Sequence, residues 1–90
     1  MKEVDYYYSD DCGIDMLMKR LYDPEKGILT EFIWNVKRKT WMENWERTCG
    51  YFMGFEPAHA INSEKAGKYM VRYGATEQEA DAVINKDLND

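Results

Sequence analysis

The chain has few residues of the kinds that build metal sites and disulfide frameworks. It contains two cysteines, Cys12 and Cys49, and one histidine, His59. The cysteines form no CxxC pair, so a tetrahedral zinc site would need ligands gathered from distant segments. Two cysteines without a secretory signal are most often free thiols. We therefore expect no metal, no cofactor and no disulfide.

Long apolar runs and a targeting segment are also missing. Residues 1–11 lack the apolar core of a signal peptide, and no stretch approaches the ~18 apolar residues that cross a bilayer. The glycines of residues 50–55, GYFMGF, come without the lysine and hydroxyl residue of a phosphate-binding loop. We expect a cytoplasmic protein that does not engage membranes.

Positive charge is scarce relative to negative charge. The 90 residues carry 17 acidic and 12 basic side chains, for a net charge of −5. The acids gather in residues 1–15 and 75–90, while the middle of the chain is mildly basic. Nucleic-acid-binding proteins gain affinity from Lys and Arg side chains that displace counterions at phosphates. Direct nucleic-acid binding is therefore not expected, whereas a protein partner with a basic surface is.

Aromatic residues are plentiful and suit one compact core. The length predicts a single globular domain over residues 1–90. Three Trp, seven Tyr and three Phe offer the large apolar area that so small a domain needs. We interpret the aromatic run from Trp34 to Phe55 as core, with a protein interface as the alternative.

The spacing of apolar residues predicts a mainly helical fold, a small bundle of four to five helices. Apolar residues recur at helical spacing over residues 11–22. Thr40 and Glu43 have the spacing of a capping box, which predicts a helix that begins at Thr40 and ends near Gly54. The competing interpretation joins residues 28–53 into one longer helix.

Residues 28–39 fit two periods. Their apolar side chains make a helical stripe, yet they also alternate with polar ones as in a strand. We favour a helix, because an isolated strand has few partners in so short a chain. If this segment is a strand, residues 30–37 and residues 4–8 form a short two-stranded β element. Residues 23–27, DPEKG, predict a turn.

The last third of the chain carries the best helix signals. Residues 63–73 have helical spacing, and Gly74 follows as a C-terminal stop. Thr76 and Glu79 form a second capping box, which predicts that a final helix starts there.

This helix–glycine–helix corner, residues 63–86, suggests a helix-turn-helix transcriptional regulator as one alternative function. A DNA-reading helix presents its first turns to the major groove. Here those turns carry Glu77, Glu79 and Asp81, which would meet phosphates with like charge. We therefore expect this face to resemble phosphates and not to bind them.

Two acidic faces are the candidates for partner binding. Three consecutive tyrosines cannot all face a core from a strand or arm, so at least one is expected at the surface beside acids. The other face belongs to the final helix. The candidate partner-binding residues are Asp5, Tyr6, Tyr7, Tyr8, Asp10, Asp11, Asp15, Glu77, Glu79 and Asp81.

The function that we favour is a small, acidic, non-enzymatic binding protein that engages a basic surface of a protein partner. Inhibitors from phages and mobile elements, of the anti-CRISPR or anti-restriction type, fit this description when their carboxylates imitate phosphates. A second alternative is a cysteine-dependent enzyme in which His59 activates Cys49. Both residues have simpler explanations, because a small thiol on an apolar helical face packs well and a loop histidine bonds locally.

Overall fold

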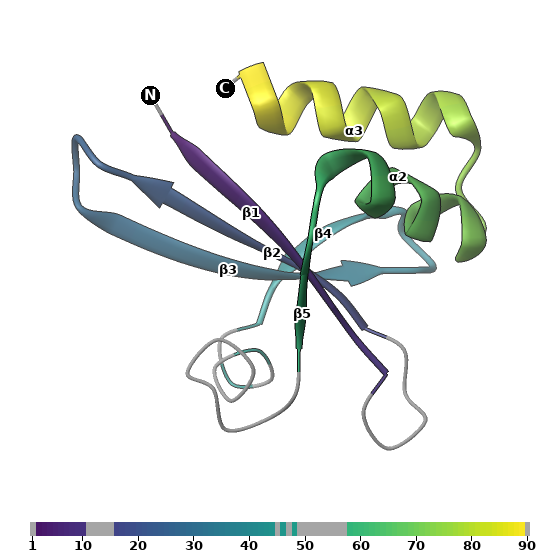
Figure 1. Cartoon of the computed structure of the whole chain (residues 1–90), viewed down its shortest axis with the longest axis horizontal. Helices are drawn as coiled ribbons and strands as arrows, with labels where there is room; N and C mark the ends of the chain where they lie inside the picture. The colour runs from purple at the N-terminus through teal and green to yellow at the C-terminus, as the bar shows by residue number, and fades with distance from the viewer. Residues whose placement is uncertain (1, 11–15, 45, 47, 49–57, 90) are drawn as a thin grey trace.

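The computed structural model describes residues 2–10, 16–44, 46, 48 and 58–89. Within these residues the chain forms an antiparallel sheet of five strands, followed by two helices that lie over one face of the sheet (Figure 1). The elements are β1 Glu3–Ser9, β2 Met16–Asp23, β3 Ile28–Asn35, β4 Thr40–Glu43, β5 His59–Ile61, α2 Ser63–Arg72 and α3 Glu77–Asn89. The strand order is β4-β3-β2-β1-β5.

The prediction of a mainly helical bundle of four to five helices is wrong, and its error is clearest at residues 11–22. Residues 16–23 of the chain form β2, the central strand, which pairs with β1 on one side and β3 on the other. Met16, Leu17, Met18 and Lys19 are all buried. A strand that is buried on both faces has apolar residues at odd and even positions, and this pattern also satisfies helical spacing.

The second error concerns the segment from Ile28 to Glu43. The favoured helix over residues 28–39, the helix predicted to begin at Thr40 and the longer helix that was to begin at residue 28 are all wrong there. The segment forms a hairpin of β3 and β4, with Trp34 opposite Trp41. A hydrogen bond stabilises the turn between the two strands: the Lys39 amide donates to the Asn35 carbonyl oxygen at 2.8 Å. The proposed pairing of residues 4–8 with 30–37 is also wrong, because β2 lies between β1 and β3.

The predicted local motifs of the last third are confirmed. Glu79 donates its amide to the Thr76 hydroxyl at 3.1 Å, and the Thr76 amide donates to Glu79 Oε1 at 2.9 Å. Gly74 ends the corner with a φ of 108°. The predicted turn at residues 23–27 is also present, with Gly27 at a φ of 66°.

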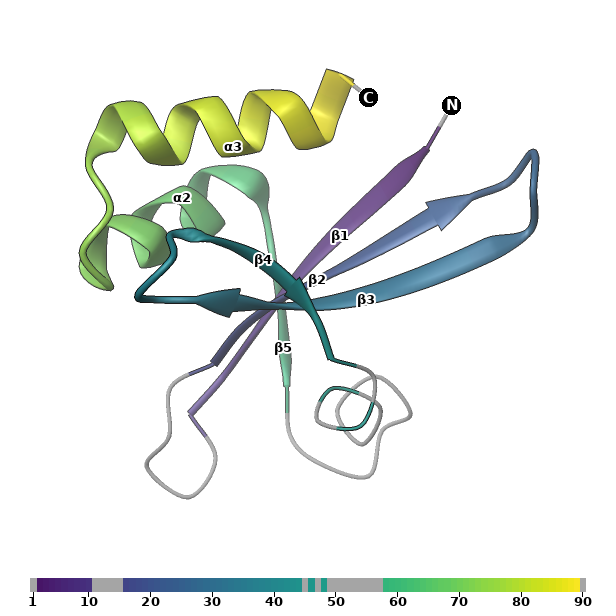
Figure 2. The same ribbon diagram turned by 180° about the vertical axis from the view of Figure 1, so that it is seen from behind.

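The core lies between the sheet and the two helices (Figure 2). It consists of Tyr6, Leu17, Trp34, Ala66, Met70, Ala75 and Ala80. No helix among the described residues is long and apolar enough to cross a membrane.

Candidate protein-binding groove

The sheet separates the three tyrosines that the sequence places together. Because side chains alternate along a strand, Tyr6 and Tyr8 face the helices and Tyr7 faces away. Tyr6 is 3% exposed, and Tyr7 and Tyr8 are half-buried. Tyr8 stacks on Tyr69 of α2 with ring centroids 4.2 Å apart. Tyr6 is therefore a core residue, and the predicted face keeps only part of its tyrosine surface.

The acids of that face have different positions. Asp5 is exposed and lies 3.6 Å from the guanidinium of Arg20, which also donates to the Tyr7 hydroxyl at 3.1 Å. Asp10 is exposed at the end of β1. Asp11 and Asp15 lie outside the described residues. The described part of this face is thus a mixed-charge surface, in which Arg20 partly offsets Asp5.

One carboxylate that sequence analysis missed organises the interface between sheet and helix. Asp87 of α3 accepts from Lys19 Nζ at 2.8 Å, from the Tyr6 hydroxyl at 3.0 Å and from Trp41 Nε1 at 3.0 Å. The side chains of Lys19 and Asp87 are only 7% and 9% exposed. This cluster fixes α3 to β1, β2 and β4.

The electrostatics of the Asp87 cluster are those of a satisfied structural site. Burial, followed by the charge of Asp87 and the hydrogen bond to it, raises the pKa of Tyr6 far above its ordinary range. Lys19 Nζ also lies 4.4 Å from the centre of the Phe32 ring, a cation–π distance. The charges of Lys19 and Asp87 are paired, and Asp87 is engaged by three donors, so the cluster is suited to holding α3 in place.

The three predicted acids of α3 divide between structure and surface. Glu79 belongs to the capping box and lies 3.4 Å from Lys39 Nζ. Its hydrogen bonds with Thr76 lower the pKa of Glu79, with a smaller contribution from Lys39. Glu77 and Asp81 are exposed on the side of α3 that faces α2.

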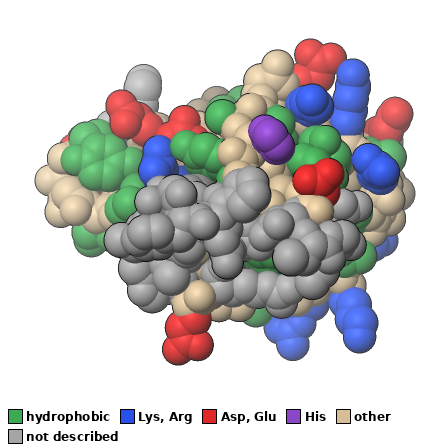
Figure 3. All heavy atoms as spheres, turned by 60° about the horizontal axis from the view of Figure 1, so that its bottom comes forward, with side chains coloured by type: hydrophobic (Ala, Val, Ile, Leu, Met, Phe, Trp, Pro, Cys, Tyr) green, Lys and Arg blue, Asp and Glu red, His purple; other side chains and the backbone are tan. Residues whose placement is uncertain are grey.

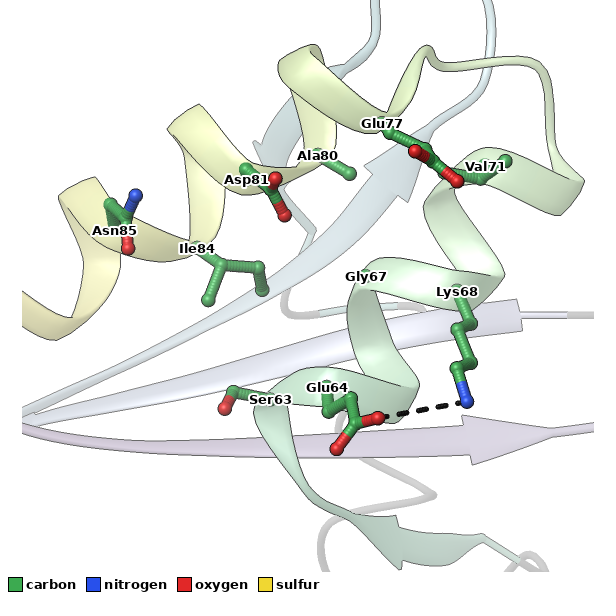
Figure 4. A pocket seen from close by; sticks show the side chains of 10 residues that line it. All are labelled: Ser63, Glu64, Gly67, Lys68, Val71, Glu77, Ala80, Asp81, Ile84 and Asn85. Atoms are coloured by element: carbon green, nitrogen blue, oxygen red, sulfur yellow. Dashed lines mark ion pairs between the residues drawn. The ribbon is translucent and has the colours of Figure 1, made fainter.

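A groove of about 390 Å³ lies between the two helices. In Figure 4 side chains from both helices border this space, and Asp81 and Ile84 point into it. Its lining residues are Ser63, Glu64, Gly67, Lys68 and Val71 from α2, and Glu77, Ala80, Asp81, Ile84 and Asn85 from α3. The floor of the groove consists of the small or apolar residues Gly67, Ala80 and Ile84. Its walls carry three carboxylates, from Glu64, Glu77 and Asp81, and one lysine, Lys68.

Gly67 leaves the floor of the groove open. A Cβ atom at this position would have Ile84 Cγ1 as its nearest neighbour, at 4.0 Å, an ordinary contact. Glycine in the middle of a helix costs roughly 0.5–1 kcal/mol relative to alanine. The described packing therefore does not require a glycine at this position.

Comparison of the chain with protein-family models, curated proteins and solved structures finds no match.

The alternative enzyme and metal hypotheses rest on Cys12, Cys49 and His59. Cys12 and Cys49 lie outside the described residues. His59 is exposed on β5, and the histidine side chain is visible at the surface near charged groups in Figure 3. Within the described ranges, no three His, Cys, Asp or Glu side chains gather as metal ligands would.

The sequence signals for the groove were present but incomplete. Glu77 and Asp81 were named as partner-binding candidates, and both line it. The contribution of α2 was missed, because nothing local indicates that Gly67 lies beside Ile84 of α3. Only the angle between the two helices creates that relation.

Proposed function

We propose that this protein is a non-enzymatic binding protein that holds a basic segment of a partner protein in the groove between α2 and α3. The observation that carries the proposal is the combination of a small apolar floor with a rim of carboxylates. Glu77 and Asp81 stand on one wall and Glu64 on the other. The proposal keeps the function class expected from composition and gives it a defined site.

The charges of the groove favour a cationic occupant. Its single lysine, Lys68, lies 3.7 Å from Glu64, so these two charges offset each other. Glu77 and Asp81 have no such cation among the groove residues. Exposed ion pairs contribute only about 0.2–1 kcal/mol each, so the carboxylates mainly select and steer the partner. Affinity comes from apolar burial on the floor.

A basic partner of this kind includes nucleic-acid-binding proteins. An inhibitor of the anti-CRISPR or anti-restriction type would use Glu77 and Asp81 where its target expects phosphates. The helix-turn-helix alternative needs the first turns of α3 to approach DNA, and those same carboxylates oppose that approach. Our proposal therefore includes an inhibitor of this type and does not include a DNA-binding regulator.

The test compares two charge reversals of equal size. Glu77→Lys with Asp81→Lys changes the groove, and Asp5→Lys with Asp10→Lys changes the face on β1. Binding is measured by fluorescence anisotropy, using labelled peptides that combine lysine or arginine with leucine. We expect the groove variant to lose about ten-fold or more in affinity, which corresponds to about 1.4 kcal/mol, and the control much less.

Equal losses in the two variants would mean that only net charge matters, and the groove assignment would then be wrong. Thermal melts followed by circular dichroism check that both variants fold. The comparison is repeated at higher salt, where an effect of long-range charge fades because the screening length shortens.

A further inference from the structure

We infer that the occupant of the groove is a short amphipathic helix that carries Lys or Arg residues one turn apart. This inference rests on the proposed function and specifies the shape of the partner. An extended basic peptide is the competing occupant. The choice between the two follows from the backbone, the length and the charge spacing of the groove.

The walls of the groove offer no sheet edge to an extended peptide. Both walls are α-helices, whose peptide groups bond within the helix. At the C-terminal end of α2, the Tyr73, Gly74 and Ala75 amides donate to carbonyl oxygens of its last turn. An extended segment would gain no backbone hydrogen bonds from these walls, and its peptide groups that face the floor would lose water without a replacement partner. A helix brings its peptide groups already paired.

The length of the groove walls corresponds to about two turns of helix. From Ser63 to Val71, and from Glu77 to Asn85, each wall is about 12 Å long at a rise of about 1.5 Å per residue. Wall residues recur three and four positions apart on both helices, as the faces of packed helices do. The small floor residue Gly67 lets a third helix approach closely.

The carboxylates of α3 set the register of the charges. Glu77 and Asp81 are four residues apart on one helix, which places their Cβ atoms about 5–6 Å from each other. Basic residues four positions apart on a partner helix have the same separation. Such a helix satisfies both carboxylates at once, while its apolar or small face lies on Gly67, Ala80 and Ile84.

The experiment uses three labelled peptides of matched length. The first arranges leucine and alanine on one helical face and places lysines four residues apart beside it. The second has the same composition in strict alternation, as in a strand. The third is the first peptide with a central proline, which breaks a helix. Fluorescence anisotropy reports affinity, and circular dichroism reports helix formation on addition of the protein.

We expect the helical peptide to bind at least ten-fold more tightly than the other two and to gain helical signal when bound. Gly67→Leu fills the floor and should abolish binding, whereas Lys65→Leu adds the same side chain on α2 outside the groove and should not. Gly67→Ala provides a second variant that folds at least as well as the parent chain, because alanine favours helix. It should weaken binding by a smaller factor.

Each remaining result has a distinct meaning. If the alternating peptide binds as tightly as the helical one, and both lose affinity with Glu77→Lys and Asp81→Lys, the helix inference is overturned and the groove proposal stands. If no peptide distinguishes the parent chain from Gly67→Leu, both fail. A second copy of this chain is the remaining occupant to test, and sedimentation velocity of the chain alone measures whether it dimerises. A dimer that Gly67→Leu abolishes would place a second copy in the groove and overturn the inference.

Discussion

Replacing Asp87 by alanine removes a carboxylate that accepts from Lys19, Tyr6 and Trp41. The Lys19 ammonium, whose side chain is 7% exposed, would then stay buried without its counter-charge. Breaking a buried ion pair by removing one partner costs about 3–5 kcal/mol. The Phe32 ring, 4.4 Å from Lys19 Nζ, remains and offsets part of that cost. We therefore expect a loss of about 3 kcal/mol in the free energy of unfolding.

Urea denaturation followed by tryptophan fluorescence and by circular dichroism measures this loss. A small domain has an m-value near 1 kcal/mol per molar urea, so a loss of about 3 kcal/mol should lower the midpoint by about 3 M. The double variant Lys19→Met with Asp87→Leu leaves no buried charge and should be more stable than Asp87→Ala alone. Lys68→Ala removes an exposed pair and should change stability by less than about 0.5 kcal/mol.

Either of two results would show that a stranded Lys19 charge does not destabilise the variant. One is an Asp87→Ala variant within about 1 kcal/mol of the parent chain, which lies below the range for a broken buried pair. The other is a double variant as unstable as the single one, since the loss would then come from packing and not from the stranded lysine.

Two further predictions concern residues outside the groove and the Asp87 cluster. Glu31 is buried, and neither of its carboxylate oxygens has a hydrogen-bond partner among the described residues. Burial raises the pKa of Glu31 above its ordinary 4.5, and the positive charge of Arg20 opposes this shift. The folded state then binds the proton more tightly than the unfolded state, so ionised Glu31 lowers stability, and this penalty grows as pH rises through the folded pKa. Glu31→Gln should raise neutral-pH stability, with the gain shrinking as pH falls toward 4.5; urea midpoints that shift equally at both pH values would contradict this. Lys39 has a φ of 53°, which glycine adopts without strain. In chemical denaturation, Lys39→Gly should therefore raise the free energy of unfolding by up to about 1 kcal/mol, reduced by the loss of the weak ion pair with Glu79. A clear decrease would show that this ion pair contributes more than the relief of strain.

The sequence predicts those parts of the fold whose causes are local. The capping box of Thr76 and Glu79 and the stop at Gly74 depend on neighbouring residues, and the structure has them all. Strand pairing joins distant segments, so apolar spacing alone could not show that residues 16–23 form the central strand. In the Asp87 cluster the partners lie 46 to 81 positions away in the chain. Lys19 does interrupt an apolar run in the sequence, which indicates a buried charge, but this pattern does not indicate that Asp87 is its partner.

The candidate site shows the same division between local and distant causes. Glu77 and Asp81 could be named from charge alone, since acids in the first turns of a helix that begins at a cap are expected to be exposed. Gly67 could not, because its place in the groove depends on how close it lies to Ile84 on another helix. The predicted tyrosine face failed in part for the opposite reason. Strand alternation, which sequence analysis left open for residues 4–8, buries Tyr6.

Asp87 and Gly67 differ in what the structure explains about them. Asp87 is a polar residue in a buried place, but each of its contacts contributes to holding α3, so stability explains it. Stability does not explain Gly67 in the same way. Alanine at this position would stabilise α2 and meet no clash, and the described packing gains nothing from the missing methyl group. Proteins tend to break local rules of stability where binding needs it. The floor of the groove is therefore the position at which greater stability and weaker partner binding should appear together in a single substitution, Gly67→Ala.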